Sequence, residues 1–426
     1  MGGRPCEGSR KLKPIQAAPG ARQTLLALAL GALLLMTTAC GGGGGGTNTG
    51  STGGAGGDKP AGAQAGTSAD TKASAAVVTI TPKDGANNVA TSGALKVTAA
   101  SGKLSSVIVK DDKGTAVKGD IAADGASWAP DEHLGTSTKY TVDAIAKDTD
   151  GRESAKHAVF TTITPKDSFV GFYTPEDGQT VGVGMEVSLN FNRAITNKKA
   201  VEAAVQVTAS PSVPVKGHWY GNQRLDLRPE QYWAAGTKVT LSLRLDGVEG
   251  APGVYGKQSK DVKFTVGRSQ VSVVDAAKHT MTVSRNGAVI RTIPISSGAP
   301  AHTTYNGKMV MTEKYDVTRM NGDTVGFGGE YDIKDVPHAI RLTNSGTFIH
   351  GNYWAAKSIF GNSNTSHGCV GLSDTRGAGD PSTPAAWFYN QSIVGDVVQV
   401  INSKDKTVQW YNGLNGWNLS WSEWTS

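Results

Sequence analysis

The sequence predicts an all-β protein with several domains, and three observations lead to this fold class. The chain of 426 residues is too long for one ordinary core, because domains seldom exceed about 250 residues. Short runs such as Val239, Leu241 and Leu243 alternate apolar and polar side chains, which is the period of half-buried strands. Gly, Asn, Asp and Pro separate these runs. One short helix is expected, over Pro384 to Asn390.

Residues 1–39 have the pattern of a bacterial lipoprotein signal peptide. Basic residues ending at Arg22 precede an apolar run from Thr24 to Met36, which is too short to span a bilayer. A small residue, Ala39, stands directly before Cys40. We therefore expect Cys40 to be lipidated and to hold the protein at the extracytoplasmic face of the cell membrane. The alternative is an ordinary signal peptide cleaved near Ala39.

The charge of the chain argues against a nucleic-acid partner. The formal net charge is +6, but the first 39 residues hold five Lys and Arg against one Glu, so they carry +4 of it. The rest of the chain has no basic run that could follow a phosphate backbone. Residues 40–75 are then Gly, Ser and Thr-rich, and without large apolar side chains they are expected to form a flexible tether.

An internal repeat indicates two similar domains. Thr81-Pro82-Lys83-Asp84-Gly85 recurs as Thr174-Pro175-Glu176-Asp177-Gly178, near the start of two units of about ninety residues. Short alternating strands broken by turns predict an immunoglobulin-like sandwich for each unit, at residues 76–164 and 165–267. Neither unit holds a cluster of His, Cys or carboxylates, so we expect spacers, with weak wall-binding modules as the alternative.

Residues 268–402 stay β-rich but change character. Asn286-Gly287 between two apolar runs predicts a tight hairpin, and Gly395 to Val400 predicts a closing strand. A Trp-rich extension follows at residues 403–426. We expect it to pack on the neighbouring domain, although indole rings can also stack on sugars.

One thiol carries the candidate chemistry. If Cys6 leaves with the signal and Cys40 is acylated, Cys369 is the single thiol of the mature chain, and a leftover thiol in an exported protein is a candidate reactive group. It ends the run Ser366-His367-Gly368-Cys369, and fifteen residues separate His350 from that run.

Three kinds of site fit these residues. In a Cys/His acyl-transfer site, His367 and Cys369 would share one face of a strand, His350 would reach across from a neighbouring strand, and backbone N–H groups near Gly368 would hold an oxyanion. A zinc site would use His350, His367 and Cys369 as ligands. In the third arrangement the thiol is buried and inert, and both histidines have ordinary structural partners.

The spacing His-x15-Ser-His-Gly-Cys resembles the signature of the L,D-transpeptidase catalytic domain, also called the YkuD-type domain. The resemblance covers residues 268 to 401 and includes Pro294 to Gly298 and Gly395-Asp396. The layout of anchor, two immunoglobulin-like domains, catalytic domain and Trp-rich tail is similar to actinobacterial lipoproteins of this family. It implies an all-β chain in which two sandwiches precede a β-rich catalytic domain and a short extension.

The resemblance also implies catalytic roles. Cys369 matches the nucleophile, and His350 matches the base, with its other nitrogen held by the carbonyl of Gly351. His367, Gly368 and Cys369 match the oxyanion-hole segment. We expect this base to keep the pKa of the thiol below its ordinary value, so that a reactive thiolate exists at low pH.

Further positions match substrate-binding residues of the family. Tyr331 and Met320 resemble lid residues over the cleft, and Ser345 and Gly346 match a strand that lines the donor-peptide groove. Trp354 sits where an aromatic wall is expected, and Ser366 belongs to the same signature. One departure is Gly371, where the family commonly has Asn or Arg, so a polar contact to the donor stem is missing or is supplied elsewhere.

The implied reaction is ping-pong acyl transfer between peptidoglycan stems. A Cys369 thioester formed at diaminopimelate of a donor tetrapeptide stem would pass to the amine of an acceptor stem and give a 3→3 cross-link. The resemblance implies no metal or organic cofactor, and it implies carbapenem β-lactams as inhibitors. The alternatives are an L,D-carboxypeptidase that uses water as acceptor and a non-catalytic wall-binding lipoprotein.

Overall fold

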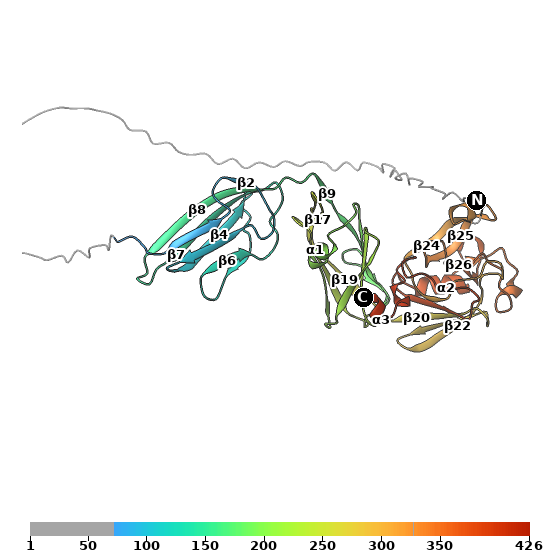
Figure 1. Cartoon of the computed structure of the whole chain (residues 1–426). Helices are drawn as coiled ribbons and strands as arrows, with labels where there is room; N and C mark the ends of the chain where they lie inside the picture. Colours follow the sequence, from blue (N-terminus) through green and yellow to red (C-terminus); the bar gives the residue numbers. More distant parts are fainter. Residues whose placement is uncertain (1–71, 327) are drawn as a thin grey trace, which may run out of the picture. The chain divides into compact units, whose positions relative to one another are not determined.

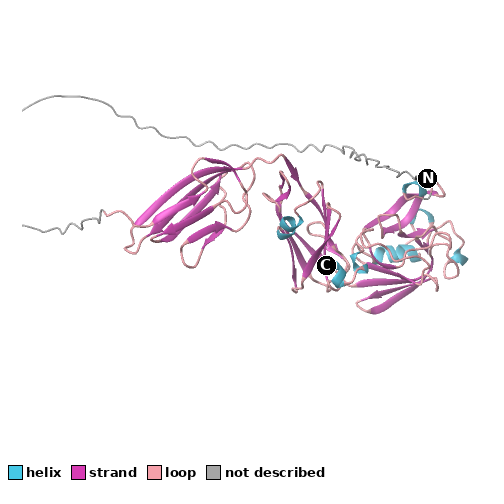
Figure 2. Ribbon diagram, in the orientation of Figure 1, coloured by secondary structure: helices cyan, strands magenta, loops and turns pink. Residues whose placement is uncertain are grey.

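The computed structural model describes residues 72–326 and 328–426, and it confirms the all-β fold class (Figures 1 and 2). The predicted signal peptide, most of the tether and Cys40 lie outside the described residues. Within the described part, no helix is both long enough and apolar enough to cross a membrane.

The first domain is a sandwich of two four-stranded sheets. Their orders are β1-β3-β6-β5 and β2-β8-β7-β4, and the buried faces enclose a core that includes Val97, Trp128, Val142 and Phe160. The alternation of buried and exposed residues along β7 is the period-two pattern of a half-buried strand. The strands are β1 (Val77–Thr81), β2 (Ala86–Val89), β3 (Lys96–Ala100), β4 (Lys103–Asp111), β5 (Gly119–Ile121), β6 (Ser127–Pro130), β7 (Lys139–Lys147) and β8 (Glu153–Thr162).

The second domain is another sandwich, with sheets β10-β12-β15-β14 and β11-β19-β16-β13 and a small third sheet, β17-β18-β9. Strand β16 contains the predicted run Val239, Leu241, Leu243, and all three side chains are buried. The elements are β9 (Asp167–Phe169), β10 (Gly171–Thr174), β11 (Thr180–Val181), β12 (Val187–Phe191), α1 (Lys198–Ala203), β13 (Val205–Ser210), β14 (Val215–Tyr220), β15 (Arg224–Pro229), β16 (Lys238–Arg244), β17 (Glu249–Ala251), β18 (Val254–Gly256) and β19 (Ser259–Val266).

The third domain is built on one nine-stranded sheet with the order β23-β28-β20-β21-β22-β27-β26-β25-β24. Helix α2 packs on the part of the sheet that contains β25, β26 and β27. The elements are β20 (Gln270–Asp275), β21 (Thr280–Arg285), β22 (Ala288–Ser296), β23 (Gly307–Val310), β24 (Glu313–Asn321), η1 (Gly322–Thr324), β25 (Asp332–Arg341), β26 (Phe348–Asn352), η2 (Lys357–Ile359), β27 (Val370–Ser373), η3 (Arg376–Ala378), α2 (Pro384–Gln391) and β28 (Val397–Ile401).

Local sequence explains three of these elements. Asn286 and Gly287 both have positive φ (49° and 83°), which is the requirement of the two-residue turn that joins β21 to β22. Helix α2 begins where the Thr383 hydroxyl accepts the N–H of Ala386 and Pro384 occupies the first turn. The expected closing strand is β28, although it lies inside the sheet between β20 and β23.

The Trp-rich extension packs on the second domain, as expected, through η4 (Gly416–Asn418) and α3 (Trp421–Trp424). The guanidinium of buried Arg228 lies 4.7 Å from the ring centre of Trp417 and 4.5 Å from that of Trp424. The indole N–H of Trp417 donates to the Gly184 carbonyl, and that of Trp424 donates to the Lys216 carbonyl. Both indole rings are therefore packed against Arg228, and the N–H group of each is hydrogen-bonded to a backbone carbonyl.

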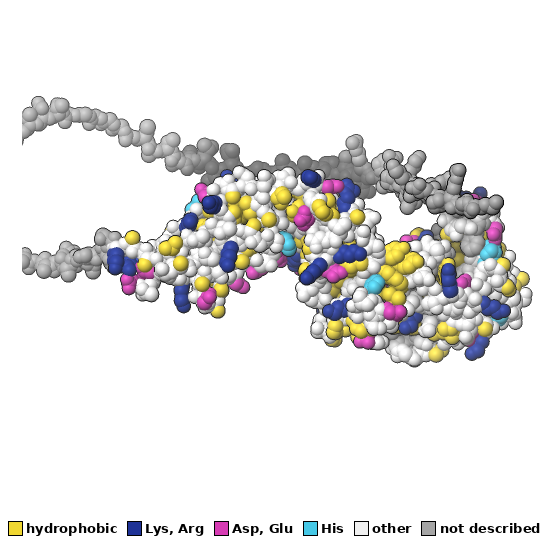
Figure 3. All heavy atoms as spheres, in the orientation of Figure 1, with side chains coloured by type: hydrophobic (Ala, Val, Ile, Leu, Met, Phe, Trp, Pro, Cys, Tyr) yellow, Lys and Arg dark blue, Asp and Glu magenta, His cyan; other side chains and the backbone are white. Residues whose placement is uncertain are grey.

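Charges of both signs are mixed on the surface. On the face drawn in Figure 3, the described Lys and Arg side chains lie among Asp and Glu and do not gather into one basic surface. Several pairs are direct, such as Arg319 with Asp332 and Arg244 with Asp261.

Candidate active site

Two adjacent parallel strands bring the thiol and an imidazole together. In the register of β26 and β27, His350 lies opposite Gly371 and Ile349 lies opposite Val370. Cys369 directly precedes β27, so its side chain comes beside the start of β26. His350 therefore lies on the strand next to the thiol, and both side chains line one cavity.

The segment that carries the thiol is not itself a strand. Residues 367–369 form a bend before β27, and Gly368 has φ of 104°, a conformation that favours glycine. The expectation that His367 and Cys369 share a strand face is therefore wrong. The bend nevertheless turns both side chains into the same cavity. The Ser366 hydroxyl stabilises it by donating to the Cys369 carbonyl at 2.6 Å and accepting the Gly368 N–H at 3.2 Å.

A cavity of about 270 Å³ opens at the thiol. Apolar and aromatic side chains form most of its wall, with a few polar groups, which is typical of a small-ligand site. Its lining residues are Met320, Tyr331, Ile333, His350, Asn352, Trp354, Ala355, Thr365, Ser366, His367 and Cys369. Six of the predicted site side chains thus meet in one cavity, together with the nucleophile.

Cys369 is buried, and its sulfur is hydrogen-bonded to the backbone. It accepts the N–H of Phe348 at 3.4 Å and donates to the Gly346 carbonyl at 3.5 Å. Burial raises the pKa of the thiol to about 11, although the Phe348 N–H and the charge of Arg341 oppose the shift. The expectation of a lowered thiol pKa is therefore wrong for this state, because Cys369 is only 9% exposed and, among the described residues, the hydrogen-bond partners of its sulfur do not include His350.

His350 is held as a neutral base. Its Nδ1 lies 2.9 Å from the Gly351 carbonyl, which can only accept, so the proton sits on Nδ1 and Nε2 keeps its lone pair. Burial lowers the pKa of His350, opposed by the Gly351 carbonyl and the Asp374 charge. The ring stacks on Trp354 with 5.6 Å between the ring centres. Trp354 thus forms the wall that the sequence predicts.

A buried hydrogen bond between His338 and Asp374 lies next to the strand that carries His350. Nδ1 of His338 lies 2.8 Å from Oδ2 of Asp374, and both side chains are almost fully buried. A Cβ at Gly351 would lie 1.9 Å from that same oxygen, so glycine is required at this position. Sequence reasoning missed this pair because His338 lies on a different strand, and only the pairing of strands brings it to Asp374, five residues after Cys369.

Two predicted substrate residues are placed differently from expectation. Ser345 and Gly346 lie in the turn between β25 and β26 and not on a strand, since Gly346 has φ of 96°. Ser345 is bound to Asn412 of the extension and does not line the cavity. Gly346 does reach the site, because its carbonyl accepts the Cys369 S–H.

Gly371, which departs from the pattern of the family, lies next to Asn352. A Cβ at Gly371 would contact Cβ and Nδ2 of Asn352 at 3.5 Å, an ordinary distance. Asn352 also lines the cavity, so its amide is a polar group next to position 371.

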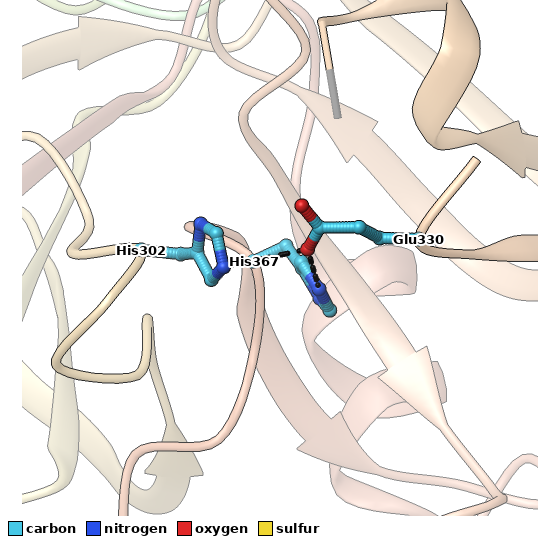
Figure 4. Close-up of side chains that lie close together, drawn as sticks. All are labelled: His302, Glu330 and His367. Carbon is cyan, nitrogen blue, oxygen red and sulfur yellow. Dashed lines mark hydrogen bonds and ion pairs between the residues drawn. The ribbon is translucent and has the colours of Figure 1, made fainter. Parts of the chain in front are cut away.

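The second histidine belongs to a different cluster. Figure 4 shows that His302, Glu330 and His367 lie close together. Each offers one ligand atom, and these atoms lie within 4.8 Å of one another. Among the described residues this group is close enough to share a metal ion, and it contains neither His350 nor Cys369. The zinc alternative of His350, His367 and Cys369 is therefore not the grouping that the fold produces.

Comparisons with known proteins agree with this architecture. Family models match residues 86–249, described as a bacterial Ig domain, and residues 269–400, described as the L,D-transpeptidase catalytic domain. L,D-transpeptidase 2 of Mycobacterium tuberculosis is 32% identical over 82% of this chain and 83% of its own length. L,D-transpeptidase 5 of the same species is 31% identical over 82% of this chain and 76% of its own length. A solved structure of an LD transpeptidase in complex with imipenem is 27% identical, covers 56% of this chain and all of that chain, and has a TM-score of 0.47.

Proposed function

Because the chain belongs to the L,D-transpeptidase family, whose members are acyltransferases, we propose that it forms 3→3 cross-links between diaminopimelate residues of peptidoglycan stems through a Cys369 thioester. One observation carries the proposal. A single cavity joins the Cys369 thiol, a neutral imidazole whose Nε2 carries a lone pair, and the bend of residues 367–369.

The first half-reaction acylates Cys369. The donor stem enters between Trp354 and the lid residues Tyr331 and Met320, and the thiol leaves the Gly346 carbonyl. As the sulfur attacks the carbonyl carbon of the third stem residue, its proton passes to Nε2 of His350. Backbone N–H groups at the bend that includes Gly368 stabilise the oxyanion. The C–N bond then breaks as His350 gives the proton to the departing amine. Terminal D-Ala is released, and the donor stem remains on Cys369 as a thioester.

The second half-reaction transfers the acyl group. The side-chain amine of an acceptor stem attacks the thioester carbonyl and gives its proton to His350, and the departing sulfur recovers a proton as the amide forms. Every proton in both halves moves between sulfur, imidazole and amine, so the steps draw on no metal or organic cofactor. Water as acceptor would instead give L,D-carboxypeptidase activity.

The same chemistry makes β-lactams candidate inhibitors. A strained lactam carbonyl at the position of the donor carbonyl acylates Cys369 and is released slowly, and a relative has been solved with imipenem bound. We place this reaction at the extracytoplasmic face of the cell membrane, with lipid on Cys40 as the anchor and the two sandwiches as spacers. The sequence pattern before Cys40 supports that location.

Purified tetrapeptide-stem muropeptides test the proposal. Wild-type protein is expected to convert them to dimers whose fragmentation reveals a 3→3 bond, and Cys369→Ala is expected to convert none. Tripeptide products without dimers would replace transpeptidation with carboxypeptidation. Unchanged substrate would leave a wall-binding protein.

A further inference from the structure

Three polar side chains from separate connections meet beside the cavity, which one of them, His367, lines (Figure 4). His302 lies between β22 and β23, Glu330 lies between β24 and β25, and His367 lies in the bend before Cys369. Oε2 of Glu330 is 3.0 Å from Nε2 of His367 and 3.4 Å from Nε2 of His302. The two imidazole rings stack with 4.8 Å between their centres. Neither His302 nor Glu330 has a part in the acyl-transfer steps.

The donor set suits a divalent transition metal. Two imidazole nitrogens and one carboxylate oxygen are ligands that zinc accepts, and a fourth position can hold water. Zinc bonds of about 2.0–2.2 Å in tetrahedral geometry place ligand atoms about 3.4 Å apart. The two separations to Glu330 already have this size, and the third is within 4.8 Å. A movement of about 1 Å therefore closes the set.

The three side chains are also accessible to a hydrated ion. Their exposed fractions are 29% for His302, 48% for Glu330 and 34% for His367. Without a metal, Oε2 of Glu330 lies within 3.4 Å of both ring nitrogens; a metal would bind the lone pairs of these nitrogens and displace any N–H hydrogen that faces the carboxylate. We propose that His302, Glu330 and His367 form a zinc-binding site beside the cavity, separate from the thiol and its base, and that bound zinc restricts access to Cys369.

Two of the three ligands, Glu330 and His367, lie in chain segments that also line the cavity at the thiol. Tyr331 follows Glu330 directly, lines the cavity, and has its ring centre 5.0 Å from that of His367. His367 is two residues before Cys369 and lines the same cavity. A metal bound by Glu330 and His367 therefore fastens the connection that carries Tyr331 to the segment that carries the nucleophile. Large ligands would then enter more slowly.

Zinc binding to the full chain tests the site, with Zn²⁺ alone as the probe and a chromophoric chelator as competitor. We expect one zinc per chain in wild type and in Cys369→Ser, and binding weaker by about tenfold or more in His302→Ala and Glu330→Gln. His157→Ala is the matched control, because His157 is an exposed histidine paired with Asp143 in the first domain. It should bind like wild type. Equal binding by wild type and His302→Ala would overturn the proposal, as would loss in Cys369→Ser alone or no binding by wild type.

A second readout measures the effect on the thiol without any peptidoglycan substrate. The rate at which a bulky maleimide alkylates Cys369 is followed by intact mass with zinc and with chelator. Zinc is expected to slow alkylation several-fold in wild type and to leave the rate of His302→Ala unchanged. Equal slowing in both proteins would mean that zinc acts on the sulfur itself, which contradicts the proposed site. This assay can fail while cross-linking activity stands, so the two proposals are tested separately.

Discussion

We expect Gly351→Ala to disable the active site by disturbing the residues that position His350. A matched control, Gly371→Ala, lies in the neighbouring strand. The added Cβ would lie 1.9 Å from Oδ2 of Asp374, whereas real Cβ contacts essentially never fall under 3.0 Å. Either the strand moves, with the carbonyl that holds His350, or Asp374 leaves His338. A buried polar group that loses its hydrogen-bond partner costs about 1–3 kcal/mol, so we expect a loss of up to about 3 kcal/mol here.

The control is Gly371→Ala, directly opposite His350 in β27. Its nearest contacts would be 3.5 Å away, and alanine is favoured over glycine within a strand by about 0.5–1 kcal/mol. The free energy of unfolding should therefore stay level or rise slightly.

Urea denaturation measures stability in both variants, and acylation by a carbapenem measures the site. We expect Gly351→Ala to acylate about a hundredfold more slowly, because a misplacement of about 1 Å has that effect on a positioned catalytic group. Gly371→Ala should acylate at close to the wild-type rate. If the two variants behaved alike in both assays, the support of His350 by the His338–Asp374 pair would be refuted.

Three further predictions concern ionisation and export. Because burial raises the pKa of Cys369 to about 11, alkylation of the resting protein by iodoacetamide should keep rising with pH up to about that value, and a plateau below pH 7 would show a stabilised thiolate instead. Burial and the nearby Asp226 charge raise the pKa of Glu186 from 4.5 to about 8, so folding favours its protonated form and the free energy of unfolding should fall as pH rises between those values. Glu186→Gln should flatten this slope in urea titrations at pH 5 to 8, and an unchanged slope would assign it to other groups. Cys40→Ala should appear in the medium or stay unprocessed, whereas equal solubility and identical cleavage of both proteins would rule out the lipid anchor.

The sequence predicts best what local residues determine. Cys369 and His350 stand out because a lone thiol beside Gly368 and His367 is a short pattern with a chemical meaning, and the parallel pairing of β26 and β27 places them together. The Asn286-Gly287 turn is equally local, since both residues tolerate positive φ. Packing of the Trp-rich tail follows from the size of indole rings, which seldom stay exposed in such numbers.

Features that depend on the order of strands in the sheet cannot be predicted from local sequence patterns. Burial of the Cys369 sulfur comes from β25 and β26 and from the turn at Gly346, so the raised thiol pKa has no sign in the motif. His302 and Glu330 meet His367 because β27 pairs with β22 and β26, far from sequence order. The expectation for Ser345 is wrong because this residue lies in a turn, where it is hydrogen-bonded to Asn412, and not on a strand.

The central claim is that Cys369 carries the donor stem as a thioester, and a single-turnover experiment tests it most directly. Wild-type protein is mixed with a tetrapeptide-stem donor whose diaminopimelate side-chain amine is acetylated, so that no acceptor is present, and is quenched in acid within seconds. Peptide mapping by mass spectrometry should find the tripeptide acyl group on the peptide that contains Cys369, with one D-Ala released per chain. An acyl group on another residue, or 3→3 dimers formed from unblocked stems by Cys369→Ala protein, would contradict the account.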